Sequence, residues 1–205
     1  MPRPANTISR EEFARLTGRR QERRTPPPAA PSRDAATAAP RRVLGLDTAL
    51  RCTGYGLVQT SGGRPTAGEY GAIRVPPRAS VTECLRHLFE TVSGMLARIR
   101  PDAVSIEGVF FSRNVRTTLR LGEARGAVLS ACARAGVPVF EYPPRRVKQA
   151  LVGTGGAQKE QVGLMVSAIL GLPAPPQPDA ADALAIAICH LHHSGGNRLL
   201  GSDPL

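Results

Sequence analysis

The sequence predicts an α/β protein built on one open sheet. Residues 43–60 have the pattern of two strands joined by a short polar turn, and short apolar runs at 103–107 and 137–141 alternate with helical periodicity. The predicted first strand ends at Asp47 and the predicted fourth at Glu107. Strand carboxyl ends face the crevice of such a sheet, so these acids are candidates for chemistry.

Composition limits the protein to one main domain with an anionic partner. The 205 residues leave room for one domain of roughly 160 residues, because the amino-terminal segment differs in composition from the rest of the chain. The net charge of +11, from 27 basic and 16 acidic residues, favours nucleic acid over the alternative of genome bias with a solvated surface. Four widely spaced cysteines indicate small buried side chains in a reducing compartment. Without a long apolar run or a secretory signal, we expect no membrane association and a cytoplasmic location.

Local composition divides the chain into three segments. Residues 1–41 are basic and rich in Pro and Ala, which predicts a disordered extension that either adds salt-sensitive DNA affinity or has no task of its own. Residues 42–194 carry the predicted strands and helices and form the folded domain. Residues 195–205 are expected to be a flexible tail.

The first half of the domain continues from the hairpin into a third strand at 66–75. Ser80 and Glu83 have capping-box spacing, which predicts a helix over 81–100. After the strand at 103–107, Asn114 is a good cap for a helix over about 115–135, on which Gly122 and Gly126 share one face that permits close packing, within the fold or across a dimer.

The second half begins with the strand at 137–141. A short helix follows at 143–149, and the glycines at 153–156 lack the Gly-Lys-Ser/Thr of a nucleotide-binding loop. A further helix carries Lys159, and a stiff proline linker leads to a buried helix over 179–190. His190, His192 and His193 at the end of that helix are expected to be a solvated cluster rather than a metal site.

Four acids are the candidate catalytic residues. Each has an ordinary explanation: Asp47 as a turn residue, Glu107 as a rim ion-pair partner, and the last two as caps of a helix. Taken together in a basic chain, they predict a carboxylate cluster, composed of Asp47, Glu107, Asp179 and Asp182. Hard oxygen ligands select Mg²⁺ or Mn²⁺, and two such ions about 4 Å apart activate water and stabilise the leaving oxygen of a phosphodiester.

Basic and aromatic residues are candidates for DNA contact. Lys148 and Lys159 are the only lysines of the chain, which suggests a need for a compact charge where arginine is used elsewhere. Phe110 lies beside arginines in a loop and is a candidate to stack on or wedge between bases, the alternative being a core position. The candidate DNA-binding residues are Phe110, Arg113, Arg116, Arg145, Arg146, Lys148 and Lys159.

Ordered motifs over about residues 42–193 resemble the RuvC family of Holliday-junction resolvases. They are Leu44-Gly-Leu-Asp47 with Thr53-Gly-Tyr-Gly56, Ile106-Glu107 with Val109-Phe110, Leu121-Gly-Glu-Ala-Arg-Gly126, Phe140-Glu-Tyr142, Val147-Lys-Gln149, Lys159 and the segment 179–187. The resemblance implies a ribonuclease H-like α/β fold, with a mixed five-stranded sheet and helices on both faces. It also implies a homodimer that nicks two strands of a four-way DNA junction symmetrically, with Mg²⁺ as cofactor, and the RuvA–RuvB branch-migration complex as a partner.

The resemblance assigns roles to single residues. The family's catalytic acids fall on Asp47, Glu107, Asp179 and Asp182; its DNA-contacting lysines fall on Lys148 and Lys159, and its junction-probing aromatic falls on Phe110. The sequence departs from the family at Thr48-Ala49, where Pro-Gly is common, at Gly108, where Gln is common, and in its 42-residue front extension.

Two other functions are compatible with part of the sequence pattern. An ATPase of the actin and sugar-kinase type also uses an Asp hairpin, but it needs two such domains, and this chain has room for one. A non-catalytic junction-binding protein on the same scaffold is the main alternative. It would gain nothing from four acids that repel one another without a metal.

Overall fold

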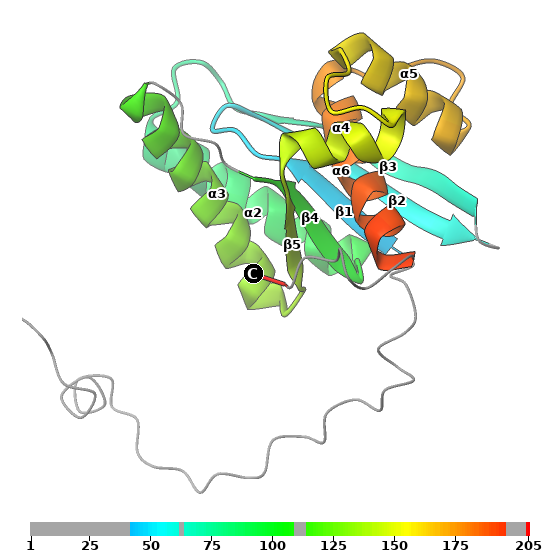
Figure 1. Ribbon diagram of the computed structural model, residues 1–205. Helices are drawn as coiled ribbons and strands as arrows, with labels where there is room; N and C mark the ends of the chain where they lie inside the picture. The colour runs from blue at the N-terminus through cyan, green and yellow to red at the C-terminus, as the bar shows by residue number, and fades with distance from the viewer. Residues whose placement is uncertain (1–41, 62–63, 109–113, 196–203) are drawn as a thin grey trace, which may run out of the picture. The chain divides into compact units, whose positions relative to one another are not determined.

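The computed structural model describes residues 42–61, 64–108, 114–195 and 204–205. The predicted extension, Phe110 and Arg113 lie outside these residues. The elements, shown in Figure 1, are β1 (Arg42–Asp47), β2 (Cys52–Ser61), β3 (Arg64–Arg74), α2 (Val81–Ile99), β4 (Ala103–Glu107), α3 (Val115–Ala135), β5 (Val139–Tyr142), α4 (Pro144–Val152), α5 (Lys159–Leu170) and α6 (Pro178–Gly195).

The five strands form one mixed sheet in the order β3-β2-β1-β4-β5. β1, β2 and β3 form an antiparallel meander, and β4 and β5 run parallel to β1. The pairing of β1 with β4 places Gly45 opposite Ser105 and Leu46 opposite Ile106. The carboxyl ends of these two neighbouring strands therefore lie at one edge of the sheet. This arrangement agrees with the predicted fold class.

Helices cover both faces of the sheet, with α2 and α3 on one and α4, α5 and α6 on the other (Figure 1). Alternation along β1 separates the two cores: Leu44 and Leu46 pack with α2 and α3, whereas Val43 packs with α6. The same alternation on β4 sends Val104 and Ile106 toward α2 and α3. Odd-numbered residues of both strands therefore face α6.

Glycines bring α6 unusually close to the hairpin. A Cβ atom on Gly45 would lie 2.0 Å from the carbonyl oxygen of Ala183, and one on Gly54 would lie 2.0 Å from that of Asp179. Gly56 meets the side chain of Leu184 in the same way, at 2.6 Å. Only residues without a side chain allow this approach. The amino end of α6 is consequently held directly over the backbone of β1 and β2.

Local signals set the helix boundaries. Ser80 and Glu83 form the predicted capping box of α2, and Asn114 accepts hydrogen bonds from the backbone of Arg116 and Thr117 at the start of α3. Gly136 ends α3 with φ of +68°. β5 begins at Val139, two residues later than predicted. Within the described residues, no helix combines the length and apolarity needed to cross a membrane.

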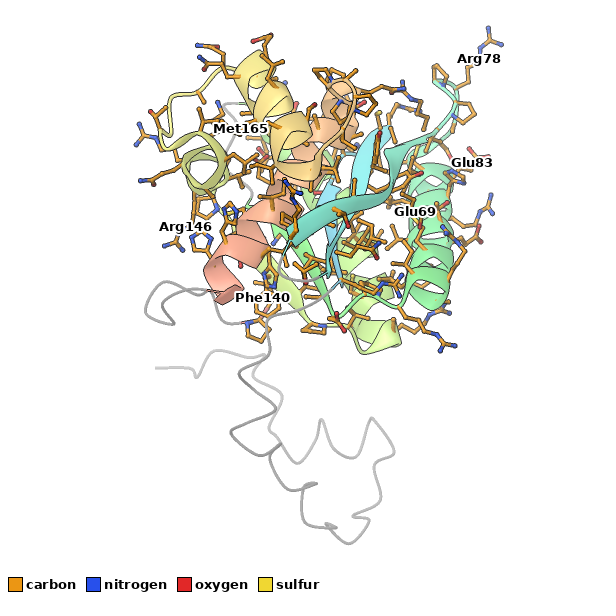
Figure 2. The ribbon with its side chains drawn as sticks, turned by 90° about the vertical axis from the view of Figure 1, so that its right-hand side faces the viewer. Glu69, Arg78, Glu83, Phe140, Arg146 and Met165 are labelled. Carbon is orange, nitrogen blue, oxygen red and sulfur yellow. The ribbon has the colours of Figure 1, made fainter. Side chains whose placement is uncertain are left out.

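The prediction of a solvated histidine cluster is wrong for His190. This residue is 1% exposed, and its Nδ1 lies 2.8 Å from the Tyr142 hydroxyl. Its ring packs on that of Phe140, with 4.5 Å between the ring centroids; Figure 2 labels Phe140. Burial lowers the pKa of His190 to about 4, so the ring is neutral at physiological pH. The apolar face of α6 continues to its last turn, which places His190 in the core, whereas His192 is exposed.

Candidate functional site

Three of the four predicted acids line one cavity at the carboxyl ends of β1 and β4. The cavity has a volume of about 260 Å³ and contains Asp47, Glu107 and Asp182 together with both lysines of the chain, Lys148 and Lys159. Val147, Val162 and Ile186 form part of its apolar wall. We call this the acid cavity. Acids and lysines that lie far apart in the sequence therefore meet in one place.

The alternation of side chains along the strands explains why the acids lie together. Asp47 is two residues beyond Gly45, which contacts α6, so its side chain is on the α6 face of the sheet. Glu107 follows the same alternation on β4. Asp182 lies in the first turns of α6, one residue before Ala183, whose carbonyl lies over Gly45. Sheet alternation and close glycine packing together direct all three carboxylates into the acid cavity.

The acids disfavour one another's charge. Burial, together with the negative charges of Asp182 and Asp179, raises the pKa of Asp47 to about 6 against the lowering effect of Lys159. Burial likewise raises the pKa of Glu107 to about 7, with Asp47 and Asp182 adding to the effect. A half-buried cluster of like charges with raised pKa values is typical of a functional site and attracts a cation.

Lys159 supplies one such cation. Its Nζ donates a hydrogen bond to Oδ2 of Asp182 at 3.0 Å, and this pair spans α5 and α6. The Lys159 side chain is 73% exposed, so solvent screens the pair and it adds little stability. The ammonium group is therefore available to exchange Asp182 for a phosphate.

Asp179 lies beside the acid cavity and is held by other partners. Its Oδ2 accepts a hydrogen bond from the Cys52 thiol at 3.0 Å and lies 3.6 Å from Nη2 of Arg74. Arg74 also donates to Gln177 at 3.0 Å. The expectation that all cysteines are buried is wrong for Cys52, which is partly exposed at the start of β2 because it faces this carboxylate. Sequence reasoning missed Cys52 and Arg74, since only the fold brings them to Asp179.

The carboxylate oxygens of the four acids are ligands that suit a hard divalent cation. Among the residues that the structure describes, no group of three or more His, Cys, Asp or Glu side chains is arranged as a metal cage. Lys159 holds Asp182, and Cys52 with Arg74 holds Asp179. Carboxylate oxygens prefer Mg²⁺ or Mn²⁺, and the raised pKa values of Asp47 and Glu107 reflect charge that such an ion would compensate.

Side chains around the site fix the strand ends. Thr53 closes the turn after Asp47, because its hydroxyl donates to the Ala49 carbonyl at 2.6 Å and accepts from the Ala49 amide at 3.1 Å. This turn forms with Thr48-Ala49. At the end of β4, Arg125 of α3 donates to the Glu107 carbonyl at 2.9 Å and pairs with Glu141. Arg125 therefore links the carboxyl end of β4 to β5.

The predicted basic contacts are dispersed around the site. Lys148 and Lys159 line the acid cavity. Arg145 is exposed on α4, and Arg116 is exposed near the start of α3, whereas Arg146 is partly buried. Phe110 and Arg113 fall outside the described residues. The lysines are therefore the predicted DNA contacts that the structure brings next to the acids.

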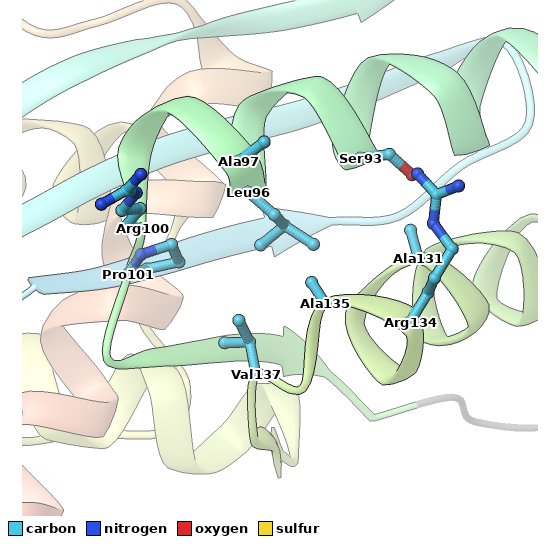
Figure 3. Close-up of a pocket in the computed structure, with 9 residues that line it drawn as sticks. All are labelled: Ser93, Leu96, Ala97, Arg100, Pro101, Ala131, Arg134, Ala135 and Val137. Atoms are coloured by element: carbon cyan, nitrogen blue, oxygen red, sulfur yellow. The ribbon is translucent and has the colours of Figure 1, made fainter.

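A second cavity lies between α2 and α3 and is shown in Figure 3. Its volume is about 490 Å³, and its lining is mainly apolar, with Arg100 and Arg134 as its charged residues. Pro101 and Val137, which precede β4 and β5, place it at the amino ends of these strands. It contains no acid, so it is a poor candidate for the chemistry expected at the opposite edge of the sheet.

Comparisons with known proteins point to one family. The model of the family described as "Crossover junction endodeoxyribonuclease RuvC" matches residues 43–190. The protein of that name from Halorhodospira halophila is 50% identical over 153 residues, which cover 74% of this chain and 90% of the relative. The namesake from Trichlorobacter lovleyi is 50% identical over 151 residues, covering 74% of this chain and 85% of the relative.

A solved structure shares the fold and the chain length of the domain. The structure of Thermus thermophilus RuvC in complex with Holliday junction substrate is 38% identical, with a TM-score of 0.75. The match covers 80% of this chain and 99% of that one. The five-stranded sheet with helices on both faces is thus the ribonuclease H-like fold that the resemblance implied.

Proposed function

This chain belongs to the RuvC family of crossover junction endodeoxyribonucleases, and we propose that it resolves four-way DNA junctions by cutting two of their strands. One observation carries the proposal: Asp47, Glu107 and Asp182 share one cavity with Lys148 and Lys159. Carboxylates for phosphodiester chemistry and lysines for the phosphate backbone are thereby combined at one edge of the sheet. We also propose a cytoplasmic location, with which a DNA substrate is consistent.

We propose that the four acids hold Mg²⁺, with Mn²⁺ as a possible substitute and two ions per site. The support is the donor set: oxygen ligands, raised pKa values at Asp47 and Glu107, and a lysine that already balances Asp182. When bound, such an ion lowers the pKa of a water molecule and stabilises charge on the leaving oxygen. Asp179 would join the ligands from its place beside the acid cavity, at the amino end of α6.

The lysines position the strand. Lys148 on α4 and Lys159 on α5 both line the acid cavity. Their ammonium groups suit the phosphates that precede and follow the scissile phosphate. Lys159 releases Asp182 as it binds phosphate, so arrival of the substrate also frees a carboxylate. Arg145 extends the positive surface along α4.

We propose a homodimer formed through one stripe of α3. Val115 is 71% exposed and Leu119 is 62% exposed, and Gly122 and Gly126 continue the same stripe with open space where a Cβ would be. An exposed apolar stripe that ends in small residues permits two helices to pack closely. Two protomers are also what the symmetric cutting of two strands needs. The RuvA–RuvB complex, implied by the family resemblance, remains a proposed partner.

The test is cleavage of a labelled four-way junction against a linear duplex of the same sequence, with Mg²⁺ or with EDTA. Asp179→Asn is compared with Glu90→Gln, a like change on the exposed face of α2, where Glu90 pairs only with Arg86 in the described residues. We expect paired nicks on the junction with Mg²⁺, lost in Asp179→Asn and kept in Glu90→Gln. Junction binding measured in EDTA should survive in both variants.

Junction binding without nicks under every metal tried would refute the nuclease and favour a non-catalytic junction-binding protein. Equal cleavage of the duplex and the junction would instead refute structure selectivity.

A further inference from the structure

The space between α2 and α3 is a second candidate site, at the edge of the sheet opposite the acid cavity. Its volume of about 490 Å³ is within the range of ligand sites. We call it the α2–α3 groove; its apolar lining includes Leu96, Ala97, Ala135 and Val137, and its charged residues are Arg100 and Arg134. Ala97 and Ala135 are both exposed, so a larger side chain at either position would fill the space. The groove is therefore open because both helices carry small residues there.

Two arginines lie at the ends of this apolar surface. Figure 3 shows Arg100 at one end of the groove and, at the other, Arg134, whose side chain extends from α3 toward Ser93 of α2. No acidic residue lines the groove, and within the described residues neither guanidinium forms an ion pair. Positive groups at both ends of an apolar slot favour a ligand that is apolar in the middle and anionic on either side.

Arg100 has an unfavourable backbone conformation. Its φ of +50° lies in the left-handed region, and it is the only residue other than glycine with a positive φ in the part of the chain that the structure describes. Glycines occupy the same place at the ends of α3, α4 and α5, namely Gly136, Gly153 and Gly171. The cap needs only the backbone amide of Arg100, which donates to the Leu96 carbonyl at 2.9 Å. A positive charge at a helix end suits the helix dipole, but glycine would relieve the strain, which points to a task for the Arg100 side chain.

Arg134 is fixed at its own end of the groove. Its Cζ lies 5.1 Å from the centroid of the Phe89 ring, and this stacking, with its place in the last turn of α3, is the structural explanation for the residue. Stacking occupies the flat face of the guanidinium and leaves its N–H groups, which point outward in the plane, for a carboxylate. The Ser93 Oγ at this end is buried and has no hydrogen-bond partner among the described residues. Polar groups at this end therefore remain available to a ligand.

We propose that the α2–α3 groove binds an acidic, apolar peptide segment of a partner protein. An apolar side chain of that segment packs against Ala97 and Ala135. Carboxylates that precede and follow it pair with Arg100 and Arg134. Nucleic acid fits this groove less well, because a sugar-phosphate backbone gains nothing from an apolar wall.

The groove is separate from both surfaces assigned above. The acids lie at the carboxyl ends of β1 and β4, whereas the groove lies at the amino ends of β4 and β5, so the partner and a DNA junction can be bound together. The groove residues of α3, which are Ala131, Arg134 and Ala135, also lie outside the stripe proposed for the dimer. The inference therefore does not depend on junction cleavage.

Selection of peptides on the full chain, without DNA, gives the first test. A displayed library of random short peptides is selected on wild type, and the affinity of the selected peptides is measured by fluorescence anisotropy. We expect peptides in which Asp or Glu residues flank a large apolar residue, with binding that weakens as salt rises. Ala135→Trp fills the groove and should abolish this binding. Ala133→Trp, at another exposed alanine of the same turn but outside the groove lining, should retain it.

Charge variants give the second test. Arg100→Glu and Arg134→Glu should each weaken the affinity of the selected peptides by about fivefold or more, since repulsion replaces an exposed ion pair. Arg78→Glu reverses a charge just before the other end of α2 and should leave the affinity unchanged.

Arg100→Gly separates binding from stability. Glycine adopts the left-handed conformation without strain, so the midpoint of urea unfolding should equal or exceed that of wild type, while peptide affinity falls. A fall in both affinity and stability would overturn the assignment of Arg100 to the peptide.

The remaining outcomes are as distinct. If every selected peptide binds Ala135→Trp as well as wild type, the groove is not the site. If a short single-stranded oligonucleotide displaces the peptides from the groove, it is a nucleic-acid surface and the proposal is wrong. Junction cleavage should be unchanged in Ala135→Trp and Arg100→Gly, and groove-dependent peptide binding by a chain that cuts no junction would uphold the groove and refute the nuclease.

Discussion

The thiol of Cys52 on β2 donates a hydrogen bond to Oδ2 of Asp179 at the start of α6, with 3.0 Å between Sγ and Oδ2. The contact orients the carboxylate of a predicted metal ligand. It also raises the pKa of the Cys52 thiol, chiefly through this hydrogen bond, so the group remains a donor. A residue outside the four acids therefore shapes the site.

Replacing Cys52 tests that role. Cys52→Val removes the donor at similar size, and we expect the Mg²⁺ concentration for half-maximal junction cleavage to rise by about threefold to tenfold, as for one ordinary hydrogen bond with a net value of roughly 1 kcal/mol. Cys52→Ser keeps a donor and should stay near wild type. Calorimetric Mn²⁺ binding gives a readout that is independent of cleavage. Identical metal affinity in all three proteins would exclude the contact from the metal site.

The raised pKa values of Asp47 and Glu107 predict how stability depends on pH without metal. The folded state favours the protonated acids, so their stabilising contribution is present below about pH 4 and is lost as pH rises through about 6 and 7. Asp47→Asn removes one charge, and we expect it to raise the free energy of unfolding at pH 8 in EDTA by about 1–3 kcal/mol. Urea unfolding at pH 5 and pH 8 measures this.

Glu90→Gln, which removes an exposed charge remote from the site, should show no such pH-dependent gain. Mg²⁺ should reverse the order at pH 8 by stabilising wild type more than Asp47→Asn. A loss of stability in Asp47→Asn at pH 8 in EDTA would contradict repulsion among the acids.

Gly45→Ala tests the close approach of α6. The new Cβ would lie 2.0 Å from the Ala183 carbonyl, so the helix must move, and we expect a loss of at least about 2–3 kcal/mol in the free energy of unfolding. Gly94→Ala on α2 is the control: its Cβ meets nothing within 4 Å, and replacing a helical glycine there should stabilise by about 0.5–1 kcal/mol. Similar effects of both changes would rule out tight packing at Gly45.

Leu119→Glu tests the proposed dimer. A charge in the middle of the α3 stripe should convert a dimer into a monomer, measured by sedimentation equilibrium, because burying it without a partner is costly. Leu164→Glu, at an equally exposed leucine on α5, should leave the mass unchanged. If wild type is monomeric at all concentrations, or if Leu119→Glu remains a dimer, the α3 interface is wrong.

Much of the architecture was predictable because its signals are local. Hydrophobic period, caps and turn residues indicated the five strands and their helices, and strand ends carrying Asp47 and Glu107 indicated the edge where the acids gather. Their shared face also follows from alternation along β1 and β4. The same reasoning joined them to the two acids at the amino end of the last helix, and the resemblance gave all four a catalytic role.

Other features could not be predicted, since they depend on contacts between distant segments. The Cys52–Asp179 hydrogen bond joins residues 127 positions apart, and the Arg125–Glu141 pair joins α3 to β5. His190 was misjudged because its place near the end of a helix, close to His192 and His193, suggested a solvated cluster. Only the packing of α6 against Tyr142 shows that the ring is buried.

The contact of α6 with bare backbone at Gly45 and Gly54 has a consequence for the timing of activity. The acids at this edge come from β1, from β4 and from α6, the last helix of the domain, and α6 packs directly on the strand backbone. The site is therefore complete only when the first strand and the last helix of the domain are packed together. A chain whose last helix has not yet been synthesised lacks Asp179 and Asp182 and has no complete acid cluster.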